Sequence, residues 1–297
     1  MINLFDLRKE QIDNDTLKLV LDKSLEDTIN FDLKSVKEKN IIVDLLDNVN
    51  ITILNVDTDK SKNITFNLFG YSKLTYNIAS FSKCEETEVV VNLNESSEFF
   101  GAYADFSIDS NAYKFTCNLN GRGSRAYWHL ATLTKNSDKK TFDVSFYHYE
   151  KDTYAKMENY GVCEEASSLS FLGTSKIFKG AKRSATHQSA KIMVFDKKCN
   201  AKASPILCID ENDVQASHAA VVGQINEDHL FYLVSRGIKE KDAKKLITLG
   251  YLMPILDHFK DEATSEIIKK NIKIIIRNNY CAKNKKRRNV FAFNIED

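Results

Sequence analysis

Short runs in which apolar and polar residues alternate fill the middle of the chain. Examples are IIVDLL (41–46), ITFNLF (64–69) and EVVVNL (88–93), which Asn, Asp, Ser and Lys residues separate. An alternation of period two with many β-branched residues is typical of half-buried strands. From about residue 41 to 210, roughly ten or more such strands at a spacing of roughly 10–14 residues predict a sandwich, a barrel or a β-solenoid. Periodicity leaves these three folds open.

A helical spacing of apolar residues is present near the start of the chain. Residues 12–30 predict one short helix, with Asn14 or Asp15 as its N-cap. The predicted apolar face of this helix consists of Leu17, Val20, Leu21 and Leu25.

Helical spacing returns in the last part of the chain. Asn226 predicts the N-cap of a first helix, and Gly237 predicts the residue just after its end. A second helix begins near residue 239, and Pro254 should kink or end it. A third is predicted over 262–277.

These patterns divide the chain into three parts. Residues 1–38 form a short N-terminal helical segment, 39–224 a β core, and 225–297 a helical C-terminal domain with the basic tail KNKKRR (283–288). We expect this tail to be a solvated end of the chain.

Composition narrows the class of protein. The chain has 297 residues, 43% of them hydrophobic, and a formal net charge of +1, so charge gives no reason to expect nucleic acid or an anionic membrane as a main partner. The first residues, MINLFDLRKEQ, contain acids and no long apolar run, so we expect no signal peptide. No stretch approaches the roughly 18 apolar residues that would span a bilayer. We therefore expect a cytoplasmic protein.

Six cysteines are present, and none lies in a CxxC pair or at a zinc-finger spacing. They are Cys84, Cys117, Cys163, Cys199, Cys208 and Cys281. In a reducing cytoplasm we expect all of these thiols to be free.

Motifs for phosphate binding and hydrolysis are missing from the sequence. It contains no GxxxxGK[ST] loop, no nucleophile elbow and no HExxH. Any use of ATP must therefore come from a partner, and we expect no enzymatic activity. The run Gly121-Arg122-Gly123 predicts an ordinary turn between strands.

Candidate metal ligands are His187, His218, Cys199 and Cys208. Imidazole nitrogen and thiolate sulfur both bind iron, and both occur in iron–sulfur proteins. A lone histidine is more often structural, however, and a buried free cysteine commonly packs as a small hydrophobic residue. These residue types alone therefore leave both roles open.

Three linked segments resemble the SufB/SufD family of iron–sulfur cluster assembly proteins. They are GAKRSATHQSAKIMVFDKKC (180–199), DENDVQASHAAVVGQI (210–225) and NEDHLFYLVSRGIKEKDAKKLITLGYL (226–252). The last one fits the family pattern E-[DE]-x-[LI]-FYL-x-x-RG-[IL]-x-x-x-[DE]-A. The positions that fit are Glu227, Asp228, Leu230, Phe231, Tyr232, Leu233, Arg236, Gly237, Ile238, Asp242 and Ala243.

The resemblance implies a mainly β fold: a right-handed parallel β-helix core followed by a C-terminal α-helical domain. It implies a non-catalytic scaffold subunit that acts with a SufC-type ABC ATPase and with a SufB-type subunit or a second identical chain. The implied cofactor is a transient iron–sulfur cluster at a subunit interface, while the participation of a flavin stays open. The implied ATPase-docking candidates in the helical domain are Phe231, Tyr232, Arg236 and Tyr251.

Two alanines favour a SufD-like chain. Ala190 stands where SufB-type sequences carry a proposed cluster cysteine, and Ala219 stands where they carry a glutamate. His218 aligns with the SufD histidine proposed to act at the interface, which makes it the tentative iron ligand. Cys199 and Cys208 lie near places where SufB-type chains also have cysteines, so an unusual SufB/SufD homologue that pairs with itself stays open.

The main alternative is a polysaccharide-binding or lyase β-helix protein. Aromatic platforms for a sugar chain would come from Tyr113, Tyr127, Trp128, Tyr147 and Tyr149. This alternative leaves the FYL-x-x-RG signature unexplained. A nucleic-acid binder that uses the basic tail is disfavoured by the net charge near zero.

Overall fold

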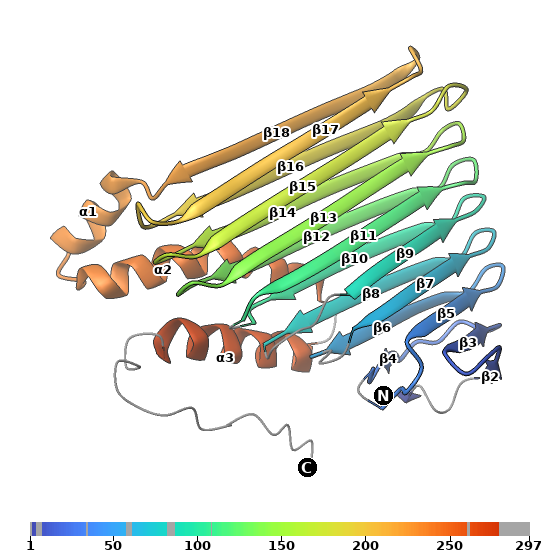
Figure 1. The fold of residues 1–297 in the computed structure, drawn as a ribbon, viewed down its shortest axis with the longest axis horizontal. Coiled ribbons are helices and arrows are strands. Elements are labelled where there is room, and N and C mark those ends of the chain that lie inside the picture. The colour runs from blue at the N-terminus through green and yellow to red at the C-terminus, as the bar shows by residue number, and fades with distance from the viewer. Residues whose placement is uncertain are drawn as a thin grey trace.

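Two long parallel sheets face each other and form the body of the protein (Figure 1). The structure is a computed structural model that describes residues 2–3, 8–33, 35–57, 61–81, 87–107, 109–259 and 262–278. Successive strands alternate between the two nine-stranded sheets, so the chain winds as a β-solenoid. Of the folds that the strand pattern allows, the solenoid implied by the family resemblance is therefore confirmed.

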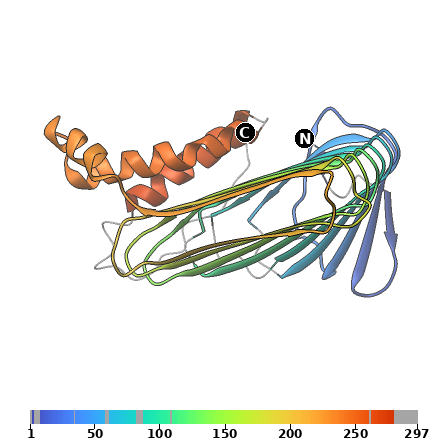
Figure 2. The same ribbon diagram turned by 90° about the horizontal axis from the view of Figure 1, so that it is seen from above.

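One sheet, here called the covered sheet, carries the C-terminal helices on its outer face (Figure 2). Its strands in spatial order are β1 (Ile2–Asn3), β4 (Thr28–Asn30), β6 (Asn50–Val56), β8 (Lys73–Ser80), β10 (Glu98–Asp105), β12 (Arg125–Thr134), β14 (Tyr154–Cys163), β16 (Ser184–Val194) and β18 (Val214–Gln224).

The other sheet, here called the exposed sheet, faces away from the helices. Its strands in spatial order are β17 (Asn200–Ile209), β15 (Ser168–Ile177), β13 (Lys139–His148), β11 (Asn111–Leu119), β9 (Thr87–Leu93), β7 (Lys62–Leu68), β5 (Asn40–Leu45), β3 (Thr16–Leu21) and β2 (Arg8–Gln11). The strand pairs of both sheets are parallel, except that β2 runs antiparallel to β3.

The turns that lead from the exposed sheet to the covered sheet repeat one backbone conformation. From the turn between β5 and β6 to the turn between β15 and β16, a residue with positive φ occurs in each, for example Ser96, Gly123 and Asp152. The amide of Ser96 donates to the carbonyl of Arg122 at 2.9 Å, and the same bond recurs one turn further on from Gly123. Stacked turns thus satisfy one another's backbone groups and fix the rise of the solenoid. The turn predicted at Gly121–Gly123 belongs to this series.

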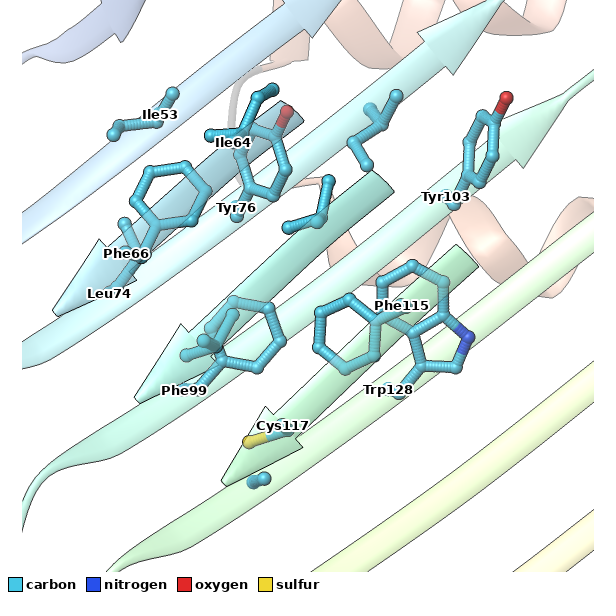
Figure 3. Close-up of a cluster of buried hydrophobic side chains, with 14 of the residues drawn as sticks. Ile53, Ile64, Phe66, Leu74, Tyr76, Phe99, Tyr103, Phe115, Cys117 and Trp128 are labelled. Atoms are coloured by element: carbon cyan, nitrogen blue, oxygen red, sulfur yellow. The ribbon is translucent and has the colours of Figure 1, made fainter. Parts of the chain in front are cut away.

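The core lies between the sheets, and its side chains stack in columns across successive strands (Figure 3). Trp128 is fully buried and stacks on Phe115 with 4.4 Å between ring centroids. Gly101 precedes Trp128 in its column, and a Cβ on this glycine would come within 2.7 Å of the indole ring. A glycine in the middle of β10 therefore makes room for the tryptophan.

The outer face of the exposed sheet is held by a ladder of amides. Asn67 donates to Asp44, Asn92 donates to Asn67, and Asn118 donates to Asn92, each at 2.8–2.9 Å. In-register parallel strands bring identical side chains into contact, so one residue type can bond to itself along the sheet.

The C-terminal helices pack on the outer face of the covered sheet. They are α1 (Glu227–Ser235), α2 (Glu240–Leu252), the 3₁₀ helix η2 (Met253–His258) and α3 (Glu262–Asn278). Leu252, Ile255 and Ile268 join a second apolar cluster with sheet residues such as Ala104 and Leu133. This second cluster ties α2, η2 and α3 to the solenoid.

The predicted ends of these helices are confirmed. The side chain of Asn226 accepts hydrogen bonds from the amides of Asp228 and His229, so it caps α1. Gly237 follows α1 with a φ of 86°. Pro254 lies at the start of η2, where α2 has ended.

The helix predicted over residues 12–30 is wrong, because this segment forms β3 and β4. Leu17, Leu19 and Leu21 are buried while the residues between them are only partly buried, as in a half-buried strand. β3 pairs in parallel with β5, which completes its backbone hydrogen bonds. The apolar spacing of the segment fits both the helical period of about 3.6 residues and the strand period of two. Pairing with the next turn of the solenoid favours the strand.

We predict that Gly101→Ala lowers the free energy of unfolding by about 1–3 kcal/mol, because the new methyl group would overlap Trp128 and Phe99. The matched control is Gly223→Ala, also in a strand of the covered sheet, where a Cβ meets no atom within 4 Å. Urea unfolding of both variants measures the difference. Equal stability of the two variants would contradict the packing described for this column.

Candidate interaction surface at the open end of the solenoid

The solenoid ends on a pair of strands that have a neighbour on one side only. β17 pairs with β15 and β18 pairs with β16, and no other described strand pairs with the free edge of either (Figure 1). Apolar side chains are exposed here, with Val221 55% and Val222 46% accessible. Ile206 and Ile209 of β17 are exposed as well. Exposed apolar side chains beside unpaired backbone groups are features typical of interaction surfaces, so this end is the candidate surface.

The edge of β18 lacks the residues that usually prevent strand pairing. Its sequence VQASHAAVVGQ contains no charged residue and no proline, whereas β17 carries Lys202 and Pro205. Natural edge strands are commonly blocked by lysine or proline. An edge of 11 residues without either is suited to pair with a further strand. This uncharged edge strand was not among the features predicted from the sequence, although the sequence of residues 214–224 shows that they carry no charge.

His218 lies in the middle of β18, at the open end. It is in register with Gln188, which points between the sheets and donates to Ser175 Oγ at 2.6 Å and to the carbonyl of Ile206 at 3.2 Å. His218 therefore continues an inward-facing column of side chains, and it is exposed because no further rung covers it. Any chain that caps this end would meet the imidazole.

His187 lies on the opposite side of the covered sheet. It precedes Gln188 in β16, so its side chain points outward, where Nδ1 is 2.7 Å from Ser217 Oγ. Its ring lies 5.8 Å from that of Tyr154. His187 and His218 thus face opposite sides of one sheet.

The two candidate cysteines are far apart. Cys199 lies just before β17, with its Sγ 3.6 Å from the carbonyl of Glu165, and Cys208 is exposed near the end of the same strand. Nine residues of extended chain separate them by roughly 30 Å, so they cannot bind the same iron atom. Within the described residues, no group of three or more His, Cys, Asp or Glu side chains is placed to hold a metal ion.

A second exposed apolar surface lies on α1. No residue of this helix is buried, and Phe231 is 74% accessible with Tyr232 and Val234 beside it. The guanidinium of Arg236 lies over the ring of Tyr232 at 5.2 Å. We refer to Phe231, Tyr232, Val234 and Arg236 as the α1 surface.

Tyr251 differs from the other docking candidates. It packs edge-on against Tyr160 of β14 with 5.7 Å between ring centroids, and burial raises its pKa to about 12. Its side chain thus helps attach α2 to the solenoid and is not part of the α1 surface.

The aromatic residues considered as sugar platforms differ in exposure, from the buried Trp128 to Tyr149, which is 43% accessible. Tyr113 and Trp128 are buried in the core. Tyr127 stacks face to face on Phe100 at 4.8 Å, and Tyr149 stacks on Phe178 at 4.6 Å. Two of the five rings are thus buried, and two have one face covered by a neighbouring ring, so the set does not form a continuous platform for a sugar chain.

Across the stretches that the structure describes, no helix is long and apolar enough to cross a membrane. The basic run at 283–288, Cys84 and Cys281 lie outside these stretches.

Taken together, the fold defines a parallel β-solenoid with an open last rung and attached C-terminal helices. The chain belongs to the SufBD core family, because the model of "SUF system FeS cluster assembly, SufBD core domain" matches residues 76–251. The resemblance based on the motifs is thus confirmed.

Individual relatives agree with this. The chain is similar to the iron-sulfur cluster assembly protein SufD of Bacillus subtilis (strain 168), with 32% identity over 151 residues, 51% of this chain and 35% of that protein. To SufB of the same organism the identity is 22%, over 51% of this chain and 32% of that protein. A SufBD family protein of Pyrococcus horikoshii is 35% identical over 94 residues, 32% of this chain and 21% of that protein. The chain therefore aligns with about a third or less of these relatives' length. It is SufD-like, because its identity to SufD of Bacillus subtilis is higher than its identity to SufB of the same organism.

We predict that the thiols react in an order set by burial. Cys208 is exposed, whereas burial raises the pKa of Cys163 to about 12 and that of Cys117 well above its ordinary value. Iodoacetamide at pH 8 should therefore modify Cys208 at least about tenfold faster than either buried thiol. Peptide-resolved mass spectrometry follows each site separately, with Cys208→Ser as the control. Equal rates at Cys163 and Cys208 would contradict the placement of these residues.

Proposed function

We propose that this chain is a non-catalytic, cytoplasmic scaffold subunit for iron–sulfur cluster assembly. The observation that carries the proposal is the open end of the solenoid, where the edge of β18 carries no charge and exposes Val221 and Val222. Such an edge is completed by a strand from another subunit. Membership of the SufBD core family supports a SufB-type subunit or a second identical chain as that partner.

Pairing through β18 would place His218 at the interface between two subunits. The midpoint of Val214–Gln224 is Ala219. Two such strands that pair antiparallel about this midpoint would set His218 of each chain opposite Ala220 of the other. An interface of this kind is self-complementary, as a two-fold dimer requires. A SufB-type strand in the same position would likewise bring its own residues next to the imidazole.

Iron–sulfur cluster is the cargo of this interface. A neutral imidazole nitrogen binds iron without having to lose a proton at pH 7. His218 supplies one such nitrogen, and the partner chain supplies the remaining ligands. Cys208, also exposed at this end, lies on the outer face of the exposed sheet, so it is less suited to share a cluster with His218.

The α1 surface is the proposed docking site for a SufC-type ABC ATPase. Its exposed rings lie on a helix of which no residue is buried, and a helix that inserts apolar side chains into a groove is a common mode of docking. Aromatic and arginine residues are also enriched among the residues that dominate binding energy. The ATPase would supply nucleotide hydrolysis, since the sequence of this chain has no phosphate-binding loop.

The pairing proposal is tested with Val221→Lys, which places a charged residue on the β18 edge. The expected result is at least tenfold weaker pairing, because lysine on an edge opposes strand addition. Leu46→Lys is the control, an exposed apolar residue outside β18. Sedimentation of the chain alone and with a co-expressed SufB-type subunit measures pairing. If Val221→Lys pairs as well as the control, the open end is not the interface.

The docking proposal is tested with Phe231→Ala. Removal of the most exposed ring of α1 should weaken capture of the co-expressed ATPase at least tenfold, and folding should be unaffected because Phe231 is not buried. Ile267→Ala, which removes an exposed apolar side chain from α3, should leave capture unchanged. Undiminished capture by Phe231→Ala and by Tyr232→Ala would place the ATPase elsewhere.

A further inference from the structure

A crevice lies between the outer face of the covered sheet and η2. Its larger cavity, of about 310 Å³, is lined by Lys73, Thr75 and Asn77 of β8, by Phe100, Gly101 and Ala102 of β10, by His129 of β12, and by Asp257 and His258 of η2. A second cavity of about 290 Å³ adjoins it and shares His129, Asp257 and His258. Volumes of this order are typical of small-molecule sites.

Two stacked imidazoles separate the cavities. The rings of His129 and His258 lie 3.6 Å apart at an interplanar angle of 14°. Burial lowers the pKa of both, that of His129 to about 4, so both rings are neutral at pH 7. Nδ1 of His129 lies 3.2 Å from Glu158. The lone pair of an imidazole nitrogen lies in the plane of the ring, so the nitrogens of two rings that stack face to face do not point at a common metal ion. This pair therefore lines the two cavities and does not form a metal site.

One polar atom in the larger cavity has no partner. Asn77 is only 4% accessible, yet its Oδ1 makes no hydrogen bond with any described residue. A buried amide oxygen without a hydrogen bond is unfavourable, and such a group calls for a specific explanation. A ligand that bonds to the amide would provide one.

The polar residues along β8 form an ordered row. Lys73, Thr75 and Asn77 alternate with the core residues Leu74 and Tyr76, so they point outward together. Alternate residues of a strand are roughly 6.6 Å apart, which makes the row roughly 13 Å long. It runs from an amide, past a hydroxyl, to an ammonium group that Glu98 contacts at 3.1 Å.

This order of groups matches the parts of a nucleoside. A side-chain amide can accept from N6–H of adenine while it donates to N7. Cytosine offers a similar donor–acceptor pair, but a bicyclic purine fills more of a cavity of about 310 Å³ than a pyrimidine does. Ala102 and Gly101, next to Asn77, give the ring a flat apolar floor, and the carboxylate of Asp257 is a suitable acceptor for ribose hydroxyls. Lys73 lies at the distance at which a 5′-phosphate would follow.

We propose that this crevice binds a purine nucleoside, with or without a 5′-phosphate. The site is separate from the open end and from the α1 surface, so it goes beyond the proposed scaffold role. Because Glu98 already balances the charge of Lys73, the nucleoside part carries most of the recognition.

The test is isothermal titration calorimetry of the full chain with adenosine, AMP, guanosine and cytidine. We expect a purine nucleoside to bind, cytidine to bind at least tenfold more weakly, and AMP to bind within a few fold of adenosine. Asn77→Leu should weaken purine binding at least tenfold and should not lower the melting temperature, since it removes an unpaired amide. Asn118→Leu, in the amide ladder of the exposed sheet, is the matched control and should bind as the wild type does.

Thr75→Val, a change of nearly equal shape, keeps the proposal testable if Asn77→Leu fails to fold, and it should weaken purine binding by a few fold. No purine binding at millimolar concentration would overturn the proposal. Binding that neither variant weakens, or equal binding of cytidine, would overturn it as well. A preference of tenfold or more for AMP over adenosine would contradict recognition through the nucleoside.

Discussion

The structure depends on the backbone hydrogen bonding of parallel strands, each of which needs a neighbour on both sides. Within the solenoid every turn supplies the neighbour of the next, and the stacked turn residues repeat the same bond from rung to rung. The first rungs taper, because β2 folds back antiparallel on β3 and β1 pairs with β4 over two residues. At the other end the full-length strands β17 and β18 have no further neighbour among the described strands, so each leaves one edge unpaired.

The same stacking decides which side chains fit in each column, both between the sheets and on their outer faces. Trp128 fits because its neighbour in the column is Gly101, and Asn118 is satisfied because its neighbour is Asn92. At the last rung a column has a neighbour on one side only, which is why His218 is exposed although it faces inward. Its accessibility is therefore a consequence of its position in the stack, and any subunit that covers the end must accommodate it.

The sequence predicted much of the fold because two local signals were strong. Alternating β-branched runs predicted the strands, and Asn226, Gly237 and Pro254 predicted the ends of the helices. The segment 12–30 was misassigned because its leucines fit both periods, and only pairing with β5 decides between them. The choice of a solenoid depended on family resemblance, since the strand pattern does not specify which strands are neighbours.

Sequence predicted the candidate site less well, because register sets the direction of each side chain. The neighbours His187 and Gln188 point to opposite sides of β16, and Cys199 and Cys208 belong to the two ends of one extended strand. The contact between His129 and His258 depends on both the solenoid and the helices that fold back over it. No local sequence pattern therefore predicted this contact.

The proposed role of the open end is tested most directly by the effect of His218→Ala on iron–sulfur maturation in cells that lack the wild-type gene. We expect normal expression and melting temperature, because the side chain is exposed, together with a strong loss of activity in client iron–sulfur enzymes. Gln215→Ala, an exposed change on the same strand, should leave maturation intact. Normal maturation in the His218→Ala strain, or a variant that fails to fold, would contradict the role of the open end as the place of cluster assembly.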